Sequence, residues 1–96
     1  MDTILSDDAI EHRLSRLNVA WTAIGNDYLV RSFQTTDFNA GVALINQIAD
    51  IANECNHHPD LSLTYTQVEV RISTHTVAGI TEADFALAAE IDARLG

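Results

Sequence analysis

The sequence predicts a single α+β domain over residues 1–96, built as a four-stranded antiparallel sheet with three helices on one face. A chain of 96 residues can bury one small core but not two. Short strand-like segments occur in two pairs, the second of which alternates apolar and polar side chains, and segments with helical periodicity flank each pair. The order α-β-β-α-β-β-α, with no linker or repeat, is typical of helices that cover one face of an antiparallel sheet.

The first quarter of the chain is predicted to hold a helix, and a β-hairpin follows it. Ser6 is a favourable N-cap, and the two aspartates after it lie where a helix dipole favours negative charge. Apolar residues then recur at steps of four and three, which predicts a helix over roughly 7–17. The segments "VAWTAI" and "YLVRSF" follow, separated by the turn-forming run "GND". We expect these two segments to pair as strands.

A second, longer helix is expected to pack against the sheet. Thr36 and Asp37 form a capping signal at its start. Pro59 cannot continue a helix and pushes His58 towards an extended conformation, so the helix is expected to end near Asn56. Its apolar face is broad, as burial against a sheet requires. The face comprises Phe38, Val42, Ile45, Ala49 and Ala52, widened by Leu44, Ile48 and Ile51.

The second hairpin shows the two-residue period of half-buried antiparallel strands. Thr66 and Gln67 are expected at the turn, although neither favours a positive φ. The alternating apolar residues are Leu61, Leu63 and Tyr65 in one strand and Val68, Val70 and Ile72 in the next.

A final helix is predicted from the segment "TEAD". Thr81 serves as its N-cap, and Asp84 stands at the third helical position, close to a capping box. Leu87, Ile91 and Leu95 are expected to face the core from this helix.

Composition disfavours several classes of function. The sequence has five arginines, no lysine and fourteen acidic residues, for a formal net charge of −9. Such a surface repels phosphate backbones and anionic lipid, so direct binding to nucleic acid or to a membrane surface is not expected. No apolar run approaches the roughly 20 residues of a membrane span, and the acidic N-terminus is unlike a secretory signal. The single cysteine, Cys55, agrees with a reducing compartment, and the cytoplasm is the expected location.

Histidines provide the main chemical signal. His57 and His58 stand at the junction of the second helix with a strand, and His75 follows the last predicted strand. If the last two strands are neighbours, the end of one returns to the start of the other, and the three imidazoles could line one cleft. They could be surface residues with no chemical role, metal ligands, or general acids and bases. Adjacent histidines in extended backbone point in opposite directions, and the HExxH spacing is absent, so no metal site is predicted.

A longer pattern adds to this interpretation. The run "NHHP", five residues, Tyr65, nine residues, His75, eight residues and Asp84 resembles the signature of the pterin-4a-carbinolamine dehydratases. Trp21, Phe33 and the segments "DFN", "STH" and "GITEADFALA" support the resemblance, which covers nearly the whole chain. The family has the same α-β-β-α-β-β-α order.

The resemblance implies an enzyme that removes water from a 4a-hydroxytetrahydropterin and releases quinonoid dihydropterin, in tetrahydropterin recycling. It implies His57, His58 and His75 as catalytic residues, with no metal and no cofactor besides the pterin substrate. The substrate-binding residues that it implies are Asn56, Pro59, Ser73, Thr74, Thr76 and Asp84. Asp84 could instead be only a helix cap. Where the family usually carries a charged residue or histidine, this chain has Asn53.

A non-catalytic role is the alternative. Some members of the family act as dimerisation cofactors or assist the assembly of other proteins, and the family forms dimers and tetramers. We therefore expect a homodimer or homotetramer, for which the broad face of the second helix could serve. The aromatic residues Trp21, Phe33, Phe38 and Tyr65 are expected in the core, and Cys55 is expected to be a buried, inert thiol.

Overall fold

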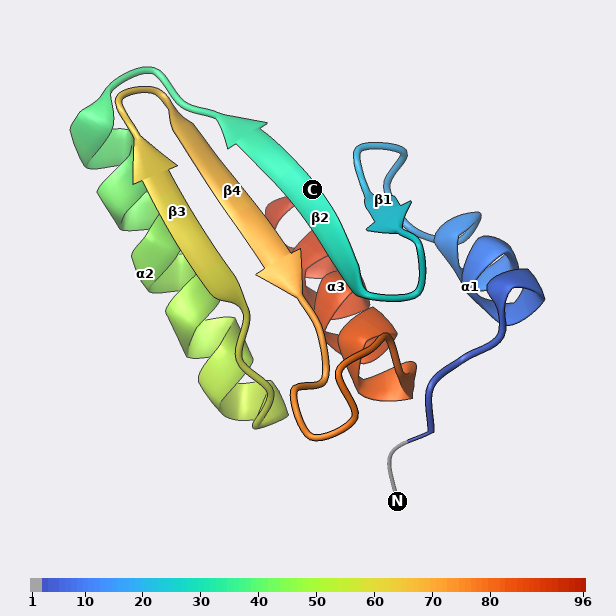
Figure 1. Cartoon of the computed structure of the whole chain (residues 1–96). Helices are drawn as coiled ribbons and strands as arrows, with labels where there is room; N and C mark the ends of the chain where they lie inside the picture. Colours follow the sequence, from blue (N-terminus) through green and yellow to red (C-terminus); the bar gives the residue numbers. More distant parts are fainter. Residues whose placement is uncertain (1–2) are drawn as a thin grey trace.

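The computed structural model describes residues 3–96 and has the predicted order of elements (Figure 1). The predicted α+β class is confirmed. The elements are α1 (Asp7–Leu14), β1 (Thr22–Ile24), β2 (Tyr28–Gln34), α2 (Phe38–Cys55), β3 (Asp60–Thr64), β4 (Gln67–Ile72) and α3 (Glu82–Leu95).

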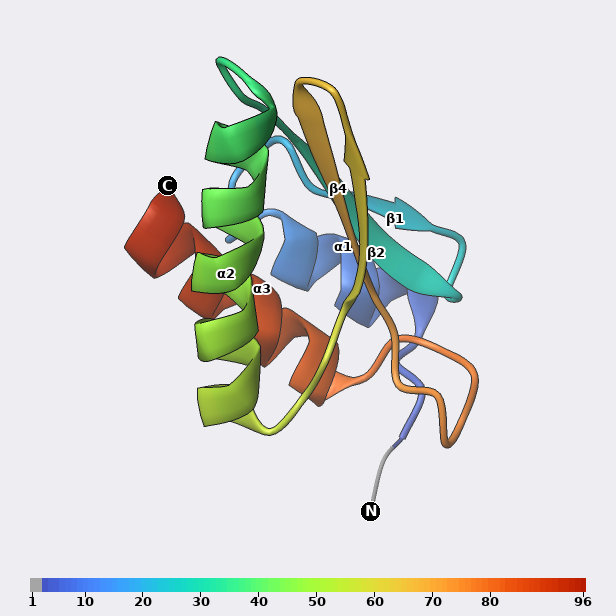
Figure 2. The same cartoon turned by 90° about the vertical axis from the view of Figure 1, so that its left-hand side faces the viewer.

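The four strands form one antiparallel sheet in the order β1-β2-β4-β3. The two hairpins therefore join through their second strands, β2 and β4, and β3 lies at one edge. Helices α2 and α3 lie against one face of this sheet, and α1 adjoins β1 (Figure 2). The cavity residues 56–60 and 73–76 lie at the end of the sheet where α2 ends and α3 begins.

The core lies between the sheet and its helices. Strand β4 buries every second side chain, as its alternation predicts, because successive residues face opposite sides of a sheet. The side chains of Ile48 from α2 and Ile91 from α3 are fully buried against this face. The wholly inaccessible apolar residues are Leu29, Ile48, Val68, Val70, Ile72, Ile80, Leu87, Ala88 and Ile91.

Two predicted elements are shorter in the structure. Helix α1 ends at Leu14 rather than near 17, because Ser15 caps it and its hydroxyl donates to the carbonyl of His12 at 2.6 Å. Strand β1 begins at Thr22 rather than at Val19, which is 99% exposed. The indole of Trp21 is buried, as predicted, and its Nε1–H donates to Asp92 at 2.8 Å.

Two aromatic residues are not in the core as predicted. Tyr65 is 73% exposed, because it and Thr66 form the β3–β4 turn in place of the predicted Thr66–Gln67 pair. Phe38 is also exposed. The buried face of α2 is centred on Ile48, Ile51 and Ala52, and the predicted face that begins at Phe38 is turned partly towards solvent. Phe33 is half-buried and packs on the core, and Cys55 is only partly buried.

Helix α2 approaches the sheet closely at Gly41. A Cβ atom there would lie 2.6 Å from Cδ1 of Leu63 in β3, so glycine allows the helix and the edge strand to make contact. None of the helices in the described part of the chain is long and apolar enough to cross a membrane.

Candidate active site

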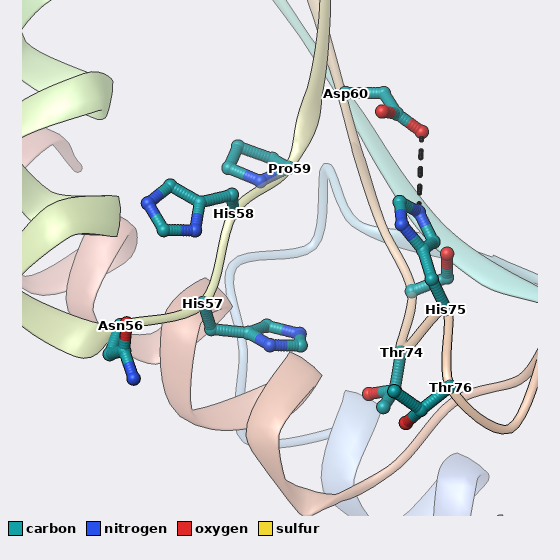
Figure 3. Close-up of a pocket in the computed structure, with 9 residues that line it drawn as sticks. Asn56, His57, His58, Pro59, Asp60, Thr74, His75 and Thr76 are labelled. Atoms are coloured by element: carbon teal, nitrogen blue, oxygen red, sulfur yellow. Dashed lines mark ion pairs between the residues drawn. The ribbon is translucent and has the colours of Figure 1, made fainter.

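A cavity of about 330 Å³ opens at one end of the sheet, between two segments that are far apart in the sequence. One segment leaves α2 and enters β3, and the other leaves β4 (Figure 3). They meet because β3 and β4 pair in antiparallel register, which sets Asp60 opposite Arg71. The cavity is lined by Asn56, His57, His58, Pro59, Asp60, Ser73, Thr74, His75 and Thr76.

The end of α2 sets the direction of the histidine pair. Asn56 adopts a left-handed conformation, with φ 52° and ψ 39°. The N–H of His57 then donates to the carbonyl of Ala52 at 3.2 Å, the six-to-one hydrogen bond of a Schellman motif. Pro59 pushes the residue before it, His58, towards an extended conformation, and β3 begins directly after the proline. Two successive backbone constraints therefore place His57 at the mouth of the cavity.

His57 is bound to a buried carboxylate. Its Nε2 lies 2.6 Å from Oδ1 of Asp84, and its side chain is 18% exposed while that of Asp84 is completely buried. A carboxylate oxygen only accepts hydrogen bonds. His57 therefore donates from Nε2–H, and its Nδ1 is the nitrogen left to exchange a proton.

Asp84 has two roles in the structure. Its Oδ2 accepts the backbone N–H of Thr81 at 2.7 Å, which completes the predicted capping box of α3. The same oxygen accepts the hydroxyl of Thr74 at 2.9 Å. Asp84 does not line the cavity but lies behind His57, so it reaches the site through that imidazole rather than as a direct contact.

The other two imidazoles are more exposed. His58 points away from His57 towards α2 (Figure 3), and its Nε2 lies 3.0 Å from Oδ1 of Asn53. His75 is 69% exposed and points towards Asp60, with its Nε2 3.8 Å from Oδ2 of that residue. Each histidine of the site thus has its own oxygen partner.

The structure brings together all the sequence-predicted site residues except Asp84 at one cavity. Asn56, Pro59, Ser73, Thr74 and Thr76 line it with the three histidines. Among residues 3–96 no group of three or more histidine, cysteine, aspartate or glutamate side chains is arranged to hold a metal ion.

Sequence reasoning missed two residues of the site. Asp60 directly follows the proline of the histidine motif, and this adjacency was a usable signal. Thr81 was predicted only as an N-cap, and its buried hydroxyl also lies 2.7 Å from that of Thr74. Only the fold brings these two threonines together.

Comparisons with known proteins give a consistent result. The family model described as pterin 4 alpha carbinolamine dehydratase matches residues 3–94. A provisionally named pterin-4-alpha-carbinolamine dehydratase of Chloroflexus aggregans is 41% identical over 76 residues, covering 79% of this chain and 81% of its own. A relative with the same provisional name from Mycobacterium bovis is 39% identical over 93 residues and covers 97% of both chains.

Solved structures share the fold. The crystal structure of a transcriptional coactivator/pterin dehydratase from Brucella melitensis superposes with a TM-score of 0.86 at 29% identity, covering 98% of this chain and all of the other. A pterin dehydratase-like protein identified as a RuBisCO assembly factor in the alpha-carboxysome superposes with a TM-score of 0.62 at 25% identity, covering 77% and 87% of the two chains. The chain described here belongs to the pterin-4-alpha-carbinolamine dehydratase family.

Proposed function

We propose that this protein dehydrates a 4a-hydroxytetrahydropterin to the quinonoid dihydropterin by histidine acid–base catalysis. The observation that carries the proposal is the cavity, which three histidines line and where the imidazole of one is hydrogen-bonded to a buried carboxylate. Membership of the family supports the choice of substrate. The cavity, at about 330 Å³, lies at the lower end of the range of about 300–1,000 Å³ for small-ligand sites.

The reaction requires two proton transfers and no other assistance. The lone pair of the nitrogen next to C4a forms the C=N bond as the C4a–O bond breaks. A general acid protonates the leaving hydroxyl so that it departs as water, and a general base removes the proton from the nitrogen. Positioned acids and bases contribute about 10²- to 10⁴-fold each. The mechanism uses no metal and no cofactor besides the pterin.

His57 is the base in this proposal. Removal of the nitrogen proton converts the imidazole to an imidazolium, and the adjacent Asp84 carboxylate stabilises that positive charge. Because Nε2–H is already donated to Asp84, the incoming proton binds at Nδ1. The arrangement holds one tautomer and one ring orientation before the substrate arrives.

His75 and His58 are the candidates for the acid. His75 faces the Asp60 carboxylate, with its Nε2 3.8 Å from Oδ2. His58 is held by an uncharged partner, Asn53. We assign the protonation of the hydroxyl to His75, because it lies on the other of the two segments that line the cavity, across from His57. Asn56, Ser73 and Thr76 supply polar groups around the cavity for the edge of the pterin ring.

A protein-binding role is the second candidate. The RuBisCO assembly factor shares this fold, and Phe38, Val42 and Tyr65 are exposed apolar or aromatic residues outside the cavity. A binding role that used this surface would not need the three histidines. Retention of the whole histidine site therefore favours catalysis.

The rate of 4a-hydroxytetrahydropterin dehydration, followed by ultraviolet absorbance, tests the proposal. The purified protein should accelerate the reaction strongly over buffer, and the rate should be unchanged by a chelator. A rate equal to that of buffer would exclude the enzyme, and a rate abolished by chelator would exclude a mechanism based on the histidines alone.

A further inference from the structure

We propose that Thr74 and Thr81 are positioning residues, whose hydroxyl groups aim Asp84 at His57. This inference rests on the proposed function in so far as it concerns turnover. The arrangement of hydrogen bonds can be tested without substrate.

The hydroxyl groups of Thr81 and Thr74 and the carboxylate of Asp84 form a chain of hydrogen bonds, and the carboxylate at its end sets which group donates at each step. Oδ2 of Asp84 can only accept, so the hydroxyl of Thr74 donates to it at 2.9 Å. That hydroxyl has no second proton, so the contact of 2.7 Å between the two hydroxyls requires Thr81 to donate to Thr74. Oγ1 of Thr81 accepts in turn from the N–H of Ala83 at 3.2 Å. Each proton in the chain has one assigned acceptor.

The backbone holds these hydroxyls in place. The N–H of Thr74 donates to the carbonyl of Gly79 at 2.9 Å, and the N–H of Gly79 donates to the carbonyl of Thr74 at 3.4 Å. Thr81 is the N-cap of α3. The three side chains of Thr74, Thr81 and Asp84 are all buried, so water does not replace their mutual hydrogen bonds. The loop from β4 and the start of α3 are thereby joined behind the cavity.

These hydrogen bonds fix the orientation of the Asp84 carboxylate. Two donors, the Thr74 hydroxyl and the Thr81 N–H, bind Oδ2 from two different segments. The carboxylate plane is thereby fixed, and Oδ1 is directed at Nε2 of His57. Without the Thr74 hydroxyl one donor is left on Oδ2, and the carboxylate can turn about its Cβ–Cγ bond. His57 would then lose its preference for one tautomer.

In this proposal Thr74 has a role other than the substrate-binding role that the resemblance implies. It lines the cavity, but its only hydroxyl proton is used inside the protein, so it cannot donate that proton to the pterin. A positioning residue changes kcat, whereas a substrate-binding residue changes KM. The two roles can be separated by kinetics.

The test compares Thr74→Val, which keeps the shape of the side chain, with Thr74→Ser, which keeps the hydroxyl. We expect Thr74→Val to lower kcat about 10- to 100-fold, at or below the lower end of the roughly 10²- to 10⁴-fold contribution of one positioned acid–base group, with KM changed less than about twofold. Thr74→Ser should recover most of kcat. Thr35→Val is the matched control, because the Thr35 hydroxyl donates to a carbonyl near the start of α2. An unchanged kcat, or a loss confined to KM, in folded Thr74→Val would overturn the proposal.

Nuclear magnetic resonance tests the same inference without turnover. In the parent protein the hydroxyl protons of Thr74 and Thr81 should exchange slowly with water, and the ring ¹⁵N shifts of His57 should show a proton on Nε2. The His57 tautomer should become mixed in Thr74→Val and be restored in Thr74→Ser. Fast exchange of both hydroxyls in the parent, or an unchanged His57 tautomer in Thr74→Val, would contradict the hydroxyl chain even if the protein proves inactive on pterins.

Discussion

At the scale of the residue, the chemistry depends on the pairing of His57 with Asp84. An isolated imidazole exchanges its proton between two nitrogens, whereas the buried carboxylate at 2.6 Å fixes one tautomer. The sequence predicted both residues but not their contact. Asp84 was predicted as a helix cap from its position and as a site residue from the resemblance alone. It lies 27 residues beyond His57, so only the tertiary fold brings them together.

Asp84→Asn tests the importance of this charge and its acceptor geometry. The amide oxygen would take the hydrogen bonds of Oδ2, and its NH₂ group would face His57 and force the imidazole proton onto Nδ1. We expect kcat to fall by about 10²-fold or more, with the fold retained in circular dichroism. Asp50→Asn, on the exposed side of α2, is the control and should keep the parent rate. A rate within twofold of the parent in Asp84→Asn would contradict the assigned tautomer.

At the scale of the element, the end of α2 is the feature that delivers the histidines. The sequence predicted this end well, because Pro59 prevents continuation of the helix, and the C-cap is at Asn56. It did not predict the left-handed conformation of Asn56, since asparagine is compatible with several conformations. The exposed position of Phe38 was also missed, because apolar periodicity alone does not say which part of a broad helix face packs. That of Tyr65 was missed because the turn was predicted one residue too late.

Comparison of Asn56→Gly with Asn56→Ala isolates the backbone contribution at this position. Both variants lose the amide, but only alanine is strained at the φ of 52°. Asn56→Ala should therefore be less stable to urea than Asn56→Gly, by about 1 kcal/mol. Equal stabilities would show that the left-handed C-cap is not present in solution.

The ion pair between α2 and α3 gives a pH-dependent prediction. The Arg94 guanidinium lowers the pKa of Glu54, chiefly through its hydrogen bond to the carboxylate and secondarily through its charge. The unfolded chain, with the ordinary pKa of 4.5, then binds protons at a higher pH than the folded protein does. The pair therefore stabilises the fold above that value and loses this effect as the pH falls through the lowered pKa.

Arg94→Ala should accordingly raise the pKa of Glu54 towards its ordinary value, as measured by a carboxyl carbon titration. The loss of stability on acidification should become less steep near pH 4.5. Because both groups are on the surface, the change in overall stability should be small. A Glu54 pKa that is the same in parent and variant would show that the pair does not form in solution.

At the scale of the whole molecule, one small core supports the site. The sequence predicted the order of elements and the burial of β4, because alternation and capping are local signals. It did not specify that β2 and β4 are central neighbours, which depends on how the two hairpins pack under α2 and α3. The sequence also did not predict that β1 pairs with β2 over only three residues, or that Trp21, just before it, binds Asp92 of α3.

Ile48→Ala tests the dependence of the fold on this core. Ile48 is fully buried between α2 and the sheet, and its truncation should lower the free energy of unfolding by about 2–5 kcal/mol. Val19→Ala is the matched control, since Val19 is almost completely exposed and its truncation should cost less than about 0.5 kcal/mol. Urea denaturation measures both. Equal losses in the two variants would contradict the packing described.

The most direct test of the central claim is the dehydration rate of His57→Ala beside that of His12→Ala. His12 is an exposed histidine on α1, outside the cavity, so its variant should keep the parent rate. We predict that His57→Ala loses about 10²- to 10⁴-fold in kcat while remaining folded. A folded His57→Ala protein that turns over as fast as His12→Ala would show that the imidazole paired with Asp84 is not the catalytic base.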